Sequence, residues 1–172
     1  MNRVIPALLA IALGGCATAP VPPTASAAPA TQVALMQPRP GLYTAGQPAA
    51  TDWPAIAARG VGTVIDLRAP GELKDRDEAG EVRAAGMHYI AIPVAGADDI
   101  NEPNARRLHE ALAAADGPVL VHCASGNRVG GLLAVMLGRV DGVPAAQALE
   151  SGRKAGMAST EARAKQVLEA GE

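Results

Sequence analysis

The strongest constraint on the fold is the alternation of short apolar runs, rich in β-forming residues, with segments of helical spacing. Strands are predicted at residues 42–46, 63–67, 88–94 and 118–122. Helices are predicted at residues 51–59, 72–85, 101–115, 129–140, 145–152 and 160–170. Strands that alternate with helices pair in parallel, and helices then cover both faces of the sheet. We therefore expect an α/β fold of three layers, with a central, mostly parallel sheet of about four to five strands flanked by helices.

The first residues predict export rather than a part of the fold. Arg3 gives a short, positively charged start, and residues 4–13 form an apolar run that is too short to span a bilayer. Small residues follow and lead to Cys16, in the order Leu-Gly-Gly-Cys. This pattern is typical of a secretory signal, and it resembles the bacterial lipobox, in which the cysteine is lipidated. We expect a signal peptide at residues 1–15 and a lipid anchor on Cys16.

The stretch after the expected lipidation site predicts a tether. Residues 16–40 are rich in alanine and proline, and the six prolines among them oppose a regular helix. The folded domain is expected at residues 41–172. Ala17 resembles the residue that directs lipoproteins to the outer membrane, so we expect a periplasm-facing protein of the bacterial cell envelope. The membrane is then a partner through the lipid alone.

Composition limits the classes of ligand. The formal net charge is −2 and aromatic residues make up 2% of the chain, with no phenylalanine. A protein with neither a basic surface nor stacking platforms is not expected to bind nucleic acid. No spacing of histidine, cysteine and acidic residues predicts a metal site, and we expect no cofactor.

One loop combines a reactive group with an anion site. Cys123 directly follows the predicted strand 118–122, and Gly126 and Arg128 follow it before the next helix begins. A helix start offers unpaired N–H groups and partial positive charge, and both favour a thiolate over a thiol. Arg128 adds a fork that suits an oxyanion. The predicted anion site consists of Ala124, Ser125, Gly126, Asn127 and Arg128.

The pattern His-Cys-x-x-Gly-x-Arg at residues 122–128 is similar to the signature of cysteine phosphatases. Residues 42–48 and 64–68 resemble the opening strands of compact dual-specificity phosphatases. Over residues 41–137 the sequence resembles the beta-lactamase hydrolase-like, phosphatase-like domain family, within the tyrosine and dual-specificity phosphatase superfamily. The resemblance implies that Cys123 is the nucleophile and Arg128 the oxyanion binder. The implied reaction is hydrolysis of a phosphoester, in a small anion or a phosphoprotein, through a cysteinyl-phosphate.

A phosphatase also needs a general acid for the leaving oxygen. In the family this acid is an aspartate on a loop after an earlier strand. Asp98 and Asp99 follow the predicted strand 88–94 and occupy that place. The alternative is that both only solvate a loop ahead of a helix cap at Asn101.

Two departures from the phosphatase pattern keep other functions open. The loop from Cys123 to Arg128 is one residue shorter than in the usual phosphatase and has the length found in rhodaneses. Val129 stands where phosphatases carry a serine or threonine that helps the thiolate leave. One alternative is therefore sulfur transfer through a persulfide on Cys123. The other is a non-catalytic module that binds an anion or a partner.

The neighbours of the loop also have two interpretations. His122 is expected to support the loop by hydrogen bonding to its backbone, rather than to act as a base. Arg68 and Glu72 either border the pocket or lie in a solvated loop. Gly130 and Gly131 are expected to let a helix approach the sheet closely.

Overall fold

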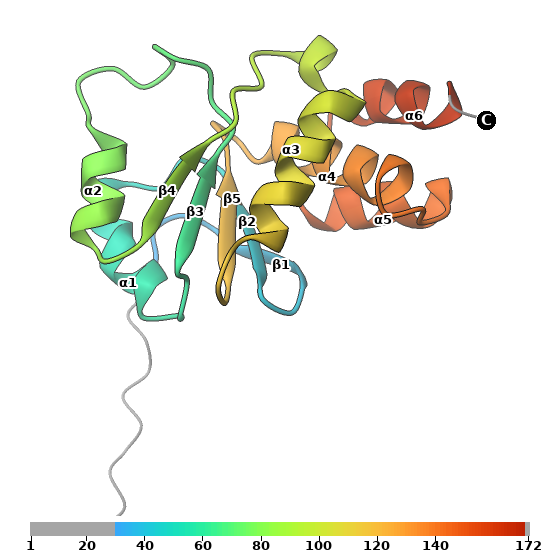
Figure 1. The fold of residues 1–172 in the computed structure, drawn as a ribbon. Helices are drawn as coiled ribbons and strands as arrows, with labels where there is room; N and C mark the ends of the chain where they lie inside the picture. The colour runs from blue at the N-terminus through green and yellow to red at the C-terminus, as the bar shows by residue number, and fades with distance from the viewer. Residues whose placement is uncertain (1–29, 171–172) are drawn as a thin grey trace, which may run out of the picture.

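The computed structural model describes residues 30–170 (Figure 1). Cys16, the predicted signal peptide and the first part of the predicted tether lie outside the described residues. Five strands form one sheet in the order β1-β2-β5-β3-β4. The strands are β1 (Met36–Arg39), β2 (Leu42–Ala45), β3 (Thr63–Asp66), β4 (His88–Ala91) and β5 (Val119–His122). All neighbouring strands are parallel except β1, which is antiparallel to β2, so the predicted fold class is confirmed.

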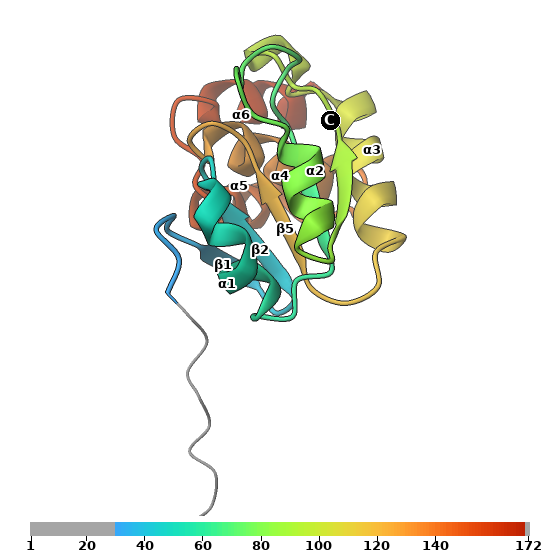
Figure 2. The ribbon, with the colours of Figure 1, turned by 90° about the vertical axis from the view of Figure 1, so that its left-hand side faces the viewer.

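Helices cover both faces of the sheet (Figure 2). They are α1 (Trp53–Ala57), α2 (Glu78–Ala84), α3 (Glu102–Ala113), α4 (Asn127–Arg139), α5 (Ala145–Lys154) and α6 (Glu161–Glu169), with 3₁₀ turns η1 (Ala50–Asp52) and η2 (Ala97–Asp99). Helices α1 and α2 pack on one face and α3 and α4 on the other, while α5 and α6 pack on α4. Within residues 30–170, none of the helices combines the length and apolar composition of a transmembrane helix.

Alternation along the strands divides the core into two parts. In β3, Val64 packs with Trp53 and α2 on one face, and Ile65 packs with α3 and α4 on the other. All four residues of β3 and of β5 are buried, as expected for parallel strands covered on both sides. Full burial of an isoleucine or leucine side chain contributes about 1.5–3 kcal/mol to the free energy of folding. The isoleucines and leucines of the two core clusters therefore stabilise the fold by burial.

The domain begins earlier than the sequence predicted, because β1 lies inside the stretch interpreted as a tether. Pro38 does not exclude a strand there, since β1 is at the edge of the sheet and its outer side needs no N–H donor. The segment before β1 is also held, because the Asp52 carboxylate accepts the backbone N–H groups of Gln32 and Val33. Those contacts join residues about twenty positions apart, and composition does not reveal them.

Helix α2 is shorter than the predicted helix at residues 72–85. It begins at Glu78, and the Asp77 side chain caps it by accepting the N–H of Gly80. Asp75 has a φ of 61°, a left-handed conformation that a continuing helix does not allow. Residues 67–77 therefore form a loop at the end of β3, which we call the Glu72 loop.

The glycines of α4 serve a different contact from the one predicted. A Cβ on Gly130 would lie 2.2 Å from the backbone nitrogen of Met157, and one on Gly131 would lie 2.5 Å from the Thr160 hydroxyl. Both glycines thus let α4 approach the C-terminal helices and the turn between them, not the sheet. The approach matters for the site, because α4 begins at the loop that carries Cys123.

Candidate active site

The strand register brings the chemistry-bearing loops to one edge of the sheet. Ala45 and Asp66, the last residues of β2 and β3, both lie opposite His122, the last residue of β5. The segments that follow these residues therefore emerge side by side at the carboxyl edge. In parallel α/β sheets this edge is where ligands bind.

Cys123 is buried, and its Sγ accepts a hydrogen bond of 3.1 Å from the backbone N–H of Gly126. Gly126 is the N-cap of α4 and has a φ of 86°, a left-handed conformation that favours glycine. A Cβ there would make only ordinary contacts, the nearest 3.5 Å from the Ala45 carbonyl carbon, so the requirement for glycine is conformational. The turn thus directs a peptide N–H at the sulfur.

The predicted anion site has free donors. Ala124 and Ser125 are exposed, and within the described part of the chain their backbone N–H groups have no protein acceptor. Asn127 and Arg128 are the first residues of α4, where N–H groups lack partners within the helix. Consecutive N–H groups of this kind at the start of a helix suit an anion with several oxygens.

The Asn127 side chain serves another purpose. Its Oδ1 accepts the backbone N–H groups of Ala158 and Thr160, at 2.8 and 3.1 Å. Its Nδ2 donates to the Ser159 hydroxyl at 2.8 Å. Asn127 therefore anchors the loop to the turn between α5 and α6, and its side chain is not available to the predicted anion site.

Arg128 is held by the Glu72 loop. Its Nη1 and Nη2 each donate to one oxygen of Glu72 at 2.6 Å, and Nη1 also donates to the Val94 carbonyl at 2.7 Å. The hydrogen bonds that Arg128 donates to Glu72 raise the pKa of Arg128, and proximity to the Cys123 sulfur raises it further. The same pair lowers the pKa of Glu72. Sequence alone left Glu72 between a pocket border and a solvated loop, and the structure places it against Arg128.

The two predicted acids differ in their surroundings. The Asp99 carboxylate accepts the backbone N–H of Ala95 at 2.8 Å, which fixes the turn η2 from within. Asp98 is exposed, and within the described residues its carboxylate has no hydrogen-bond partner. The side chains of Asn101 and Asn104 hold the loop by donating to the carbonyls of Asp98 and Asp99. Of the two, Asp98 has the carboxylate that is more exposed and less engaged by the protein.

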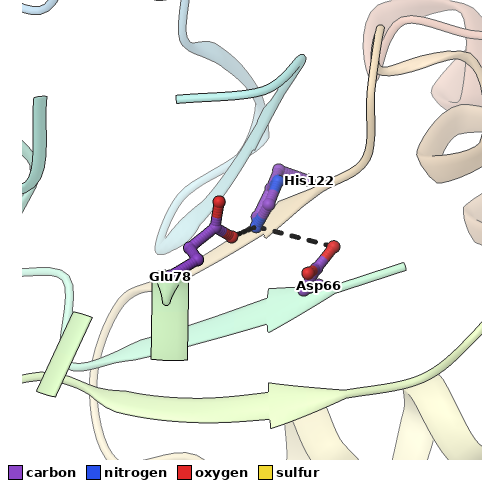
Figure 3. A group of neighbouring side chains, drawn as sticks. All are labelled: Asp66, Glu78 and His122. Atoms are coloured by element: carbon purple, nitrogen blue, oxygen red, sulfur yellow. Dashed lines mark ion pairs between the residues drawn. The ribbon is translucent and has the colours of Figure 1, made fainter. Parts of the chain in front are cut away.

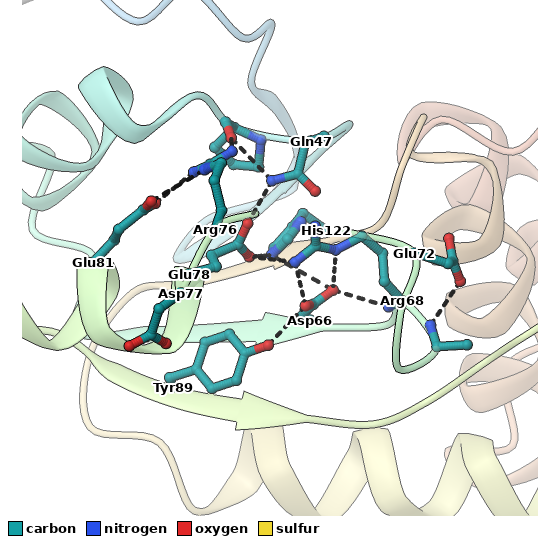
Figure 4. A network of polar contacts seen from close by, with 12 residues as sticks. Gln47, Asp66, Arg68, Glu72, Arg76, Asp77, Glu78, Glu81, Tyr89 and His122 are labelled. Carbon is teal, nitrogen blue, oxygen red and sulfur yellow. Dashed lines mark hydrogen bonds and ion pairs between the residues drawn. The ribbon is translucent and has the colours of Figure 1, made fainter. Parts of the chain in front are cut away.

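A buried polar network lies beneath the edge, on the side of α1 and α2 (Figure 4). The Asp66 carboxylate accepts four hydrogen bonds: from the backbone N–H, Nε and Nη2 of Arg68, and from the Tyr89 hydroxyl. Burial raises the pKa of Asp66, but the hydrogen bonds from Arg68 and Tyr89 and the nearby His122 together outweigh it, and the net shift is downward. Arg68 also pairs with Glu78 at 2.9 Å. The Arg68 side chain is thus fixed between two carboxylates.

His122 faces this network and not the loop backbone, so its predicted hydrogen bonds were wrong (Figure 3). Its Nε2 lies 2.9 Å from Glu78 Oε1, although the two groups are not aligned as a hydrogen bond. The edge of the Trp53 ring packs against the imidazole, with ring centroids 6.2 Å apart. His122 therefore supports the strand end from which Cys123 follows.

Among the described residues, Asp66, Glu78 and His122 offer ligand atoms within 4.8 Å of one another, the spacing of a metal site. The hydrogen bonds and ion pairs that already engage these atoms argue against a metal site. Asp66 already accepts four hydrogen bonds, and the Arg68 guanidinium occupies the space between both carboxylates. A cation would have to displace a guanidinium that neutralises the same oxygens. We therefore assign no metal to this cluster.

Comparison with known proteins decides the family. Residues 24–139 match the family model described as "Beta-lactamase hydrolase-like protein, phosphatase-like domain". The chain belongs to this family. A relative, the beta-lactamase hydrolase-like protein of Agrobacterium fabrum, is 38% identical over 91 residues, which are 51% of this chain and 21% of the relative. The match therefore spans about a fifth of that relative's length.

Solved structures agree with this assignment. A putative phosphatase from Neisseria meningitidis has a TM-score of 0.66 at 22% identity, over 77% of this chain and 96% of that one. TpbA from P. aeruginosa has a TM-score of 0.64 at 25% identity, over 87% of this chain and 94% of that one. A second structure of TpbA is a complex with pTyr. The family model and the solved structures therefore agree on a phosphatase-like α/β domain.

The network makes a testable contribution to stability. In Asp66→Asn an amide NH₂ would face the N–H donors of Arg68, so we expect a loss of about 3–5 kcal/mol, as for other broken buried ion pairs. Urea unfolding measures the loss, and the exposed Asp116→Asn is the control. Because the folded pKa of Asp66 lies below its ordinary 3.8, its stabilisation is present above that pH and is lost on further acidification. The difference between wild type and variant should shrink there, and equal stabilities at neutral pH would contradict the assigned role.

Proposed function

We propose that this protein hydrolyses phosphoesters through a cysteinyl-phosphate on Cys123. The observation that carries the proposal is the Gly126 N–H directed at the Cys123 sulfur, at the N-terminus of a helix that has Arg128 in its first turn. The helix start and the guanidinium favour negative charge on both the sulfur and a bound oxyanion. Family membership and the phosphatase-like fold support the same reaction.

The first step in this proposal is attack by the Cys123 thiolate on phosphorus. A sulfur–phosphorus bond forms and the bond from phosphorus to the leaving oxygen breaks. The N–H groups of residues 124–128 and the Arg128 guanidinium hold the non-bridging oxygens as charge develops on them. Water then attacks phosphorus, the sulfur–phosphorus bond breaks, and inorganic phosphate leaves.

Asp98 is the better proton donor of the two predicted acids. Its carboxylate is exposed and free, whereas that of Asp99 is occupied by the Ala95 N–H. A donor must be able to reach the leaving oxygen in the bound complex. Asp98 protonates that oxygen in the first step, and Asp99 keeps the loop in shape.

The substrate class follows from the site and its relatives. The backbone N–H groups at the start of α4 and the Arg128 guanidinium suit a tetrahedral anion, and the mouth of the loop at Ala124 and Ser125 is exposed. TpbA, which shares the fold, is known in a complex with pTyr. We infer that the substrate is a phosphate monoester, either in a small molecule or on a phosphoprotein, that binds at the open mouth of the Cys123 loop.

Sulfur transfer is the second candidate, and the loop itself favours it. The loop has six residues from Cys123 to Arg128, and the next residue, Val129, is buried and has no hydroxyl. With thiosulfate, the thiolate would attack the outer sulfur, the sulfur–sulfur bond would break, and sulfite would leave. The Cys123 persulfide would then pass its sulfur to a thiol or cyanide.

The two reactions leave different covalent adducts on Cys123. With an aryl phosphate, we expect wild-type turnover and a phosphate adduct on Cys123 after acid trapping, and Cys123→Ser should show neither. With thiosulfate, a mass gain of one sulfur would favour the second candidate. Mass spectrometry of the trapped protein distinguishes the two. Phosphatase activity that survives Cys123→Ser would exclude the cysteinyl-phosphate.

Substitution of Asp98 and substitution of Asp99 should have different effects on kcat and on stability. General acid–base catalysis contributes about 10²–10⁴-fold, so Asp98→Asn should lower kcat on alkyl phosphates by about that factor. The effect should be much smaller for a leaving group that needs no proton, such as para-nitrophenolate. Asp99→Asn should instead lower stability, through the loss of its bond to Ala95. If Asp98→Asn slows both substrates equally, Asp98 is not the proton donor.

We also propose that the protein is exported and lipidated on Cys16, facing the periplasm from the outer membrane. The Leu-Gly-Gly-Cys sequence and the following Ala17 support this location. The wild-type protein should incorporate labelled palmitate and sediment with outer membranes. Cys16→Ser should remain unlabelled. Cys123→Ser is the matched control, since it removes the other cysteine of the chain. Equal labelling of the wild type and Cys16→Ser would refute the proposal.

A further inference from the structure

We propose that Gly46 is a positioning residue for the anion site, which acts by allowing the backbone contact that turns the Ser125 N–H toward a bound oxyanion. The proposal rests on the anion site of the proposed function, but it concerns binding and holds whichever reaction takes place at Cys123. It depends on how the pairing of the neighbouring strands β2 and β5 ends (Figure 1).

The hydrogen bonds between β2 and β5 slip by one residue where the loop begins. The parallel ladder continues as far as the N–H of Cys123, which donates to the Ala45 carbonyl at 3.4 Å. The even spacing of a parallel ladder would next place the Gln47 N–H on the carbonyl of Cys123. The Gln47 N–H instead donates to the carbonyl of Ala124, at 3.1 Å. The chain after β2 therefore holds the peptide that follows the one a regular ladder would hold.

This slip fixes the direction of one donor of the anion site. The C=O and N–H groups of a trans peptide point in opposite directions, and the peptide between Ala124 and Ser125 is trans. Because its carbonyl is bound to Gln47, its N–H, which belongs to Ser125, points away from β2. Within residues 30–170 this N–H has no protein acceptor, and Ser125 is exposed. The Ser125 N–H is thus a free donor of fixed direction, one residue before the N–H that meets the Cys123 sulfur.

Gly46 makes the slip possible, because its backbone lies directly against the loop. A Cβ on Gly46 would lie 3.2 Å from the Ala124 carbonyl oxygen and 3.4 Å from the Ser125 Cα. The first distance is tighter than most Cβ contacts in proteins, so a side chain at this position would push the Ala124 carbonyl away from Gln47. Gly46 does not have a left-handed φ, so the need for glycine here is one of space alone.

Gln47 is itself held by the buried network. Its side-chain Nε2 donates to Glu78 Oε2 at 2.5 Å and to the Pro48 carbonyl at 2.9 Å (Figure 4). A residue before a proline is also restricted to extended backbone conformations. The N–H that binds Ala124 thus comes from a residue with little freedom to turn. Contacts therefore run from Glu78 at the start of α2, through Gln47, to the loop that carries the anion site.

The alternative is that the hydrogen bond between Gln47 and Ala124 only ends the sheet and contributes to stability. Gly62 provides the matched comparison. It lies just before β3, at the end of the strands opposite to the site, and a Cβ there would lie 3.1 Å from the Asp116 carbonyl oxygen. Gly46→Ala and Gly62→Ala therefore place the same atom against the same kind of group, and only the first does so at the anion site. Both should lower the thermal midpoint by similar amounts.

Titration calorimetry with sulfate compares the full chain as wild type, Gly46→Ala and Gly62→Ala. Sulfate is the probe because it is a tetrahedral dianion with no ester bond to hydrolyse. Positioning predicts sulfate binding weaker by about tenfold or more in Gly46→Ala, through the loss of one aligned hydrogen bond to a charged group, and unchanged binding in Gly62→Ala. Equal binding in wild type and Gly46→Ala, equal weakening in the two variants, or a wild type that binds no sulfate would overturn the proposal.

The wild type also allows a test that needs no substitution. In amide NMR spectra, the Ser125 signal should shift when sulfate is added, and the Gln47 N–H should be protected from hydrogen exchange with or without sulfate. A Ser125 signal that stays in place at saturating sulfate would overturn the proposal even if Gly46→Ala does not fold. A wild type that binds sulfate in this way but hydrolyses no phosphoester would uphold the proposal while refuting the proposed reaction.

Discussion

The site depends on one backbone turn, in which Gly126 places its N–H against the Cys123 sulfur. That turn requires a left-handed residue between the end of a buried strand and the start of a helix. Its effect is electrostatic, because the same residues that reverse the chain supply the donors for an anion. A nucleophile and the group that it attacks are both negatively charged, and their repulsion has to be offset in the site itself. The first turn of α4 and the guanidinium of Arg128 meet that requirement from two directions.

The polar network under the loop has a different role from the apolar core. Burying charged groups costs free energy that their attraction at best roughly repays, so a buried ion pair is weak evidence for stability. This network instead joins three elements, through Asp66 at the end of β3, Glu78 in the first turn of α2 and His122 at the end of β5. Ion pairs between these groups link the three elements to one another. We interpret the network as the means by which the start of the Cys123 loop and the start of the Glu72 loop are held in register.

Sequence alone predicted the parts of the fold that local patterns determine. Apolar runs and helix caps gave the parallel strands and the order of elements, and the N-cap at Asn101 is confirmed by its bond to the Asn104 N–H. The Cys123 loop was recognisable because its groups lie within six residues. Contacts between distant residues were not predictable in this way: Glu72 and Arg128 are 56 positions apart, and β1 was hidden in a stretch rich in proline. The role of His122 was mistaken for a similar reason, because its partner Glu78 is on another element.

The anchoring of Asn127 has a consequence for what counts as the functional unit. The family match ends at residue 139, with the last residue of α4, but the Asn127 amide is satisfied only by the turn at residues 158–160. Gly130 and Gly131 admit the same turn against α4. A protein truncated at the end of the family match would lack the residues that hydrogen-bond Asn127 in the first turn of α4. It would also expose the surface of α4 at Gly130 and Gly131, which the C-terminal helices and their turn cover. The folded unit that holds the Cys123 loop therefore extends beyond the family match, to the turn between α5 and α6.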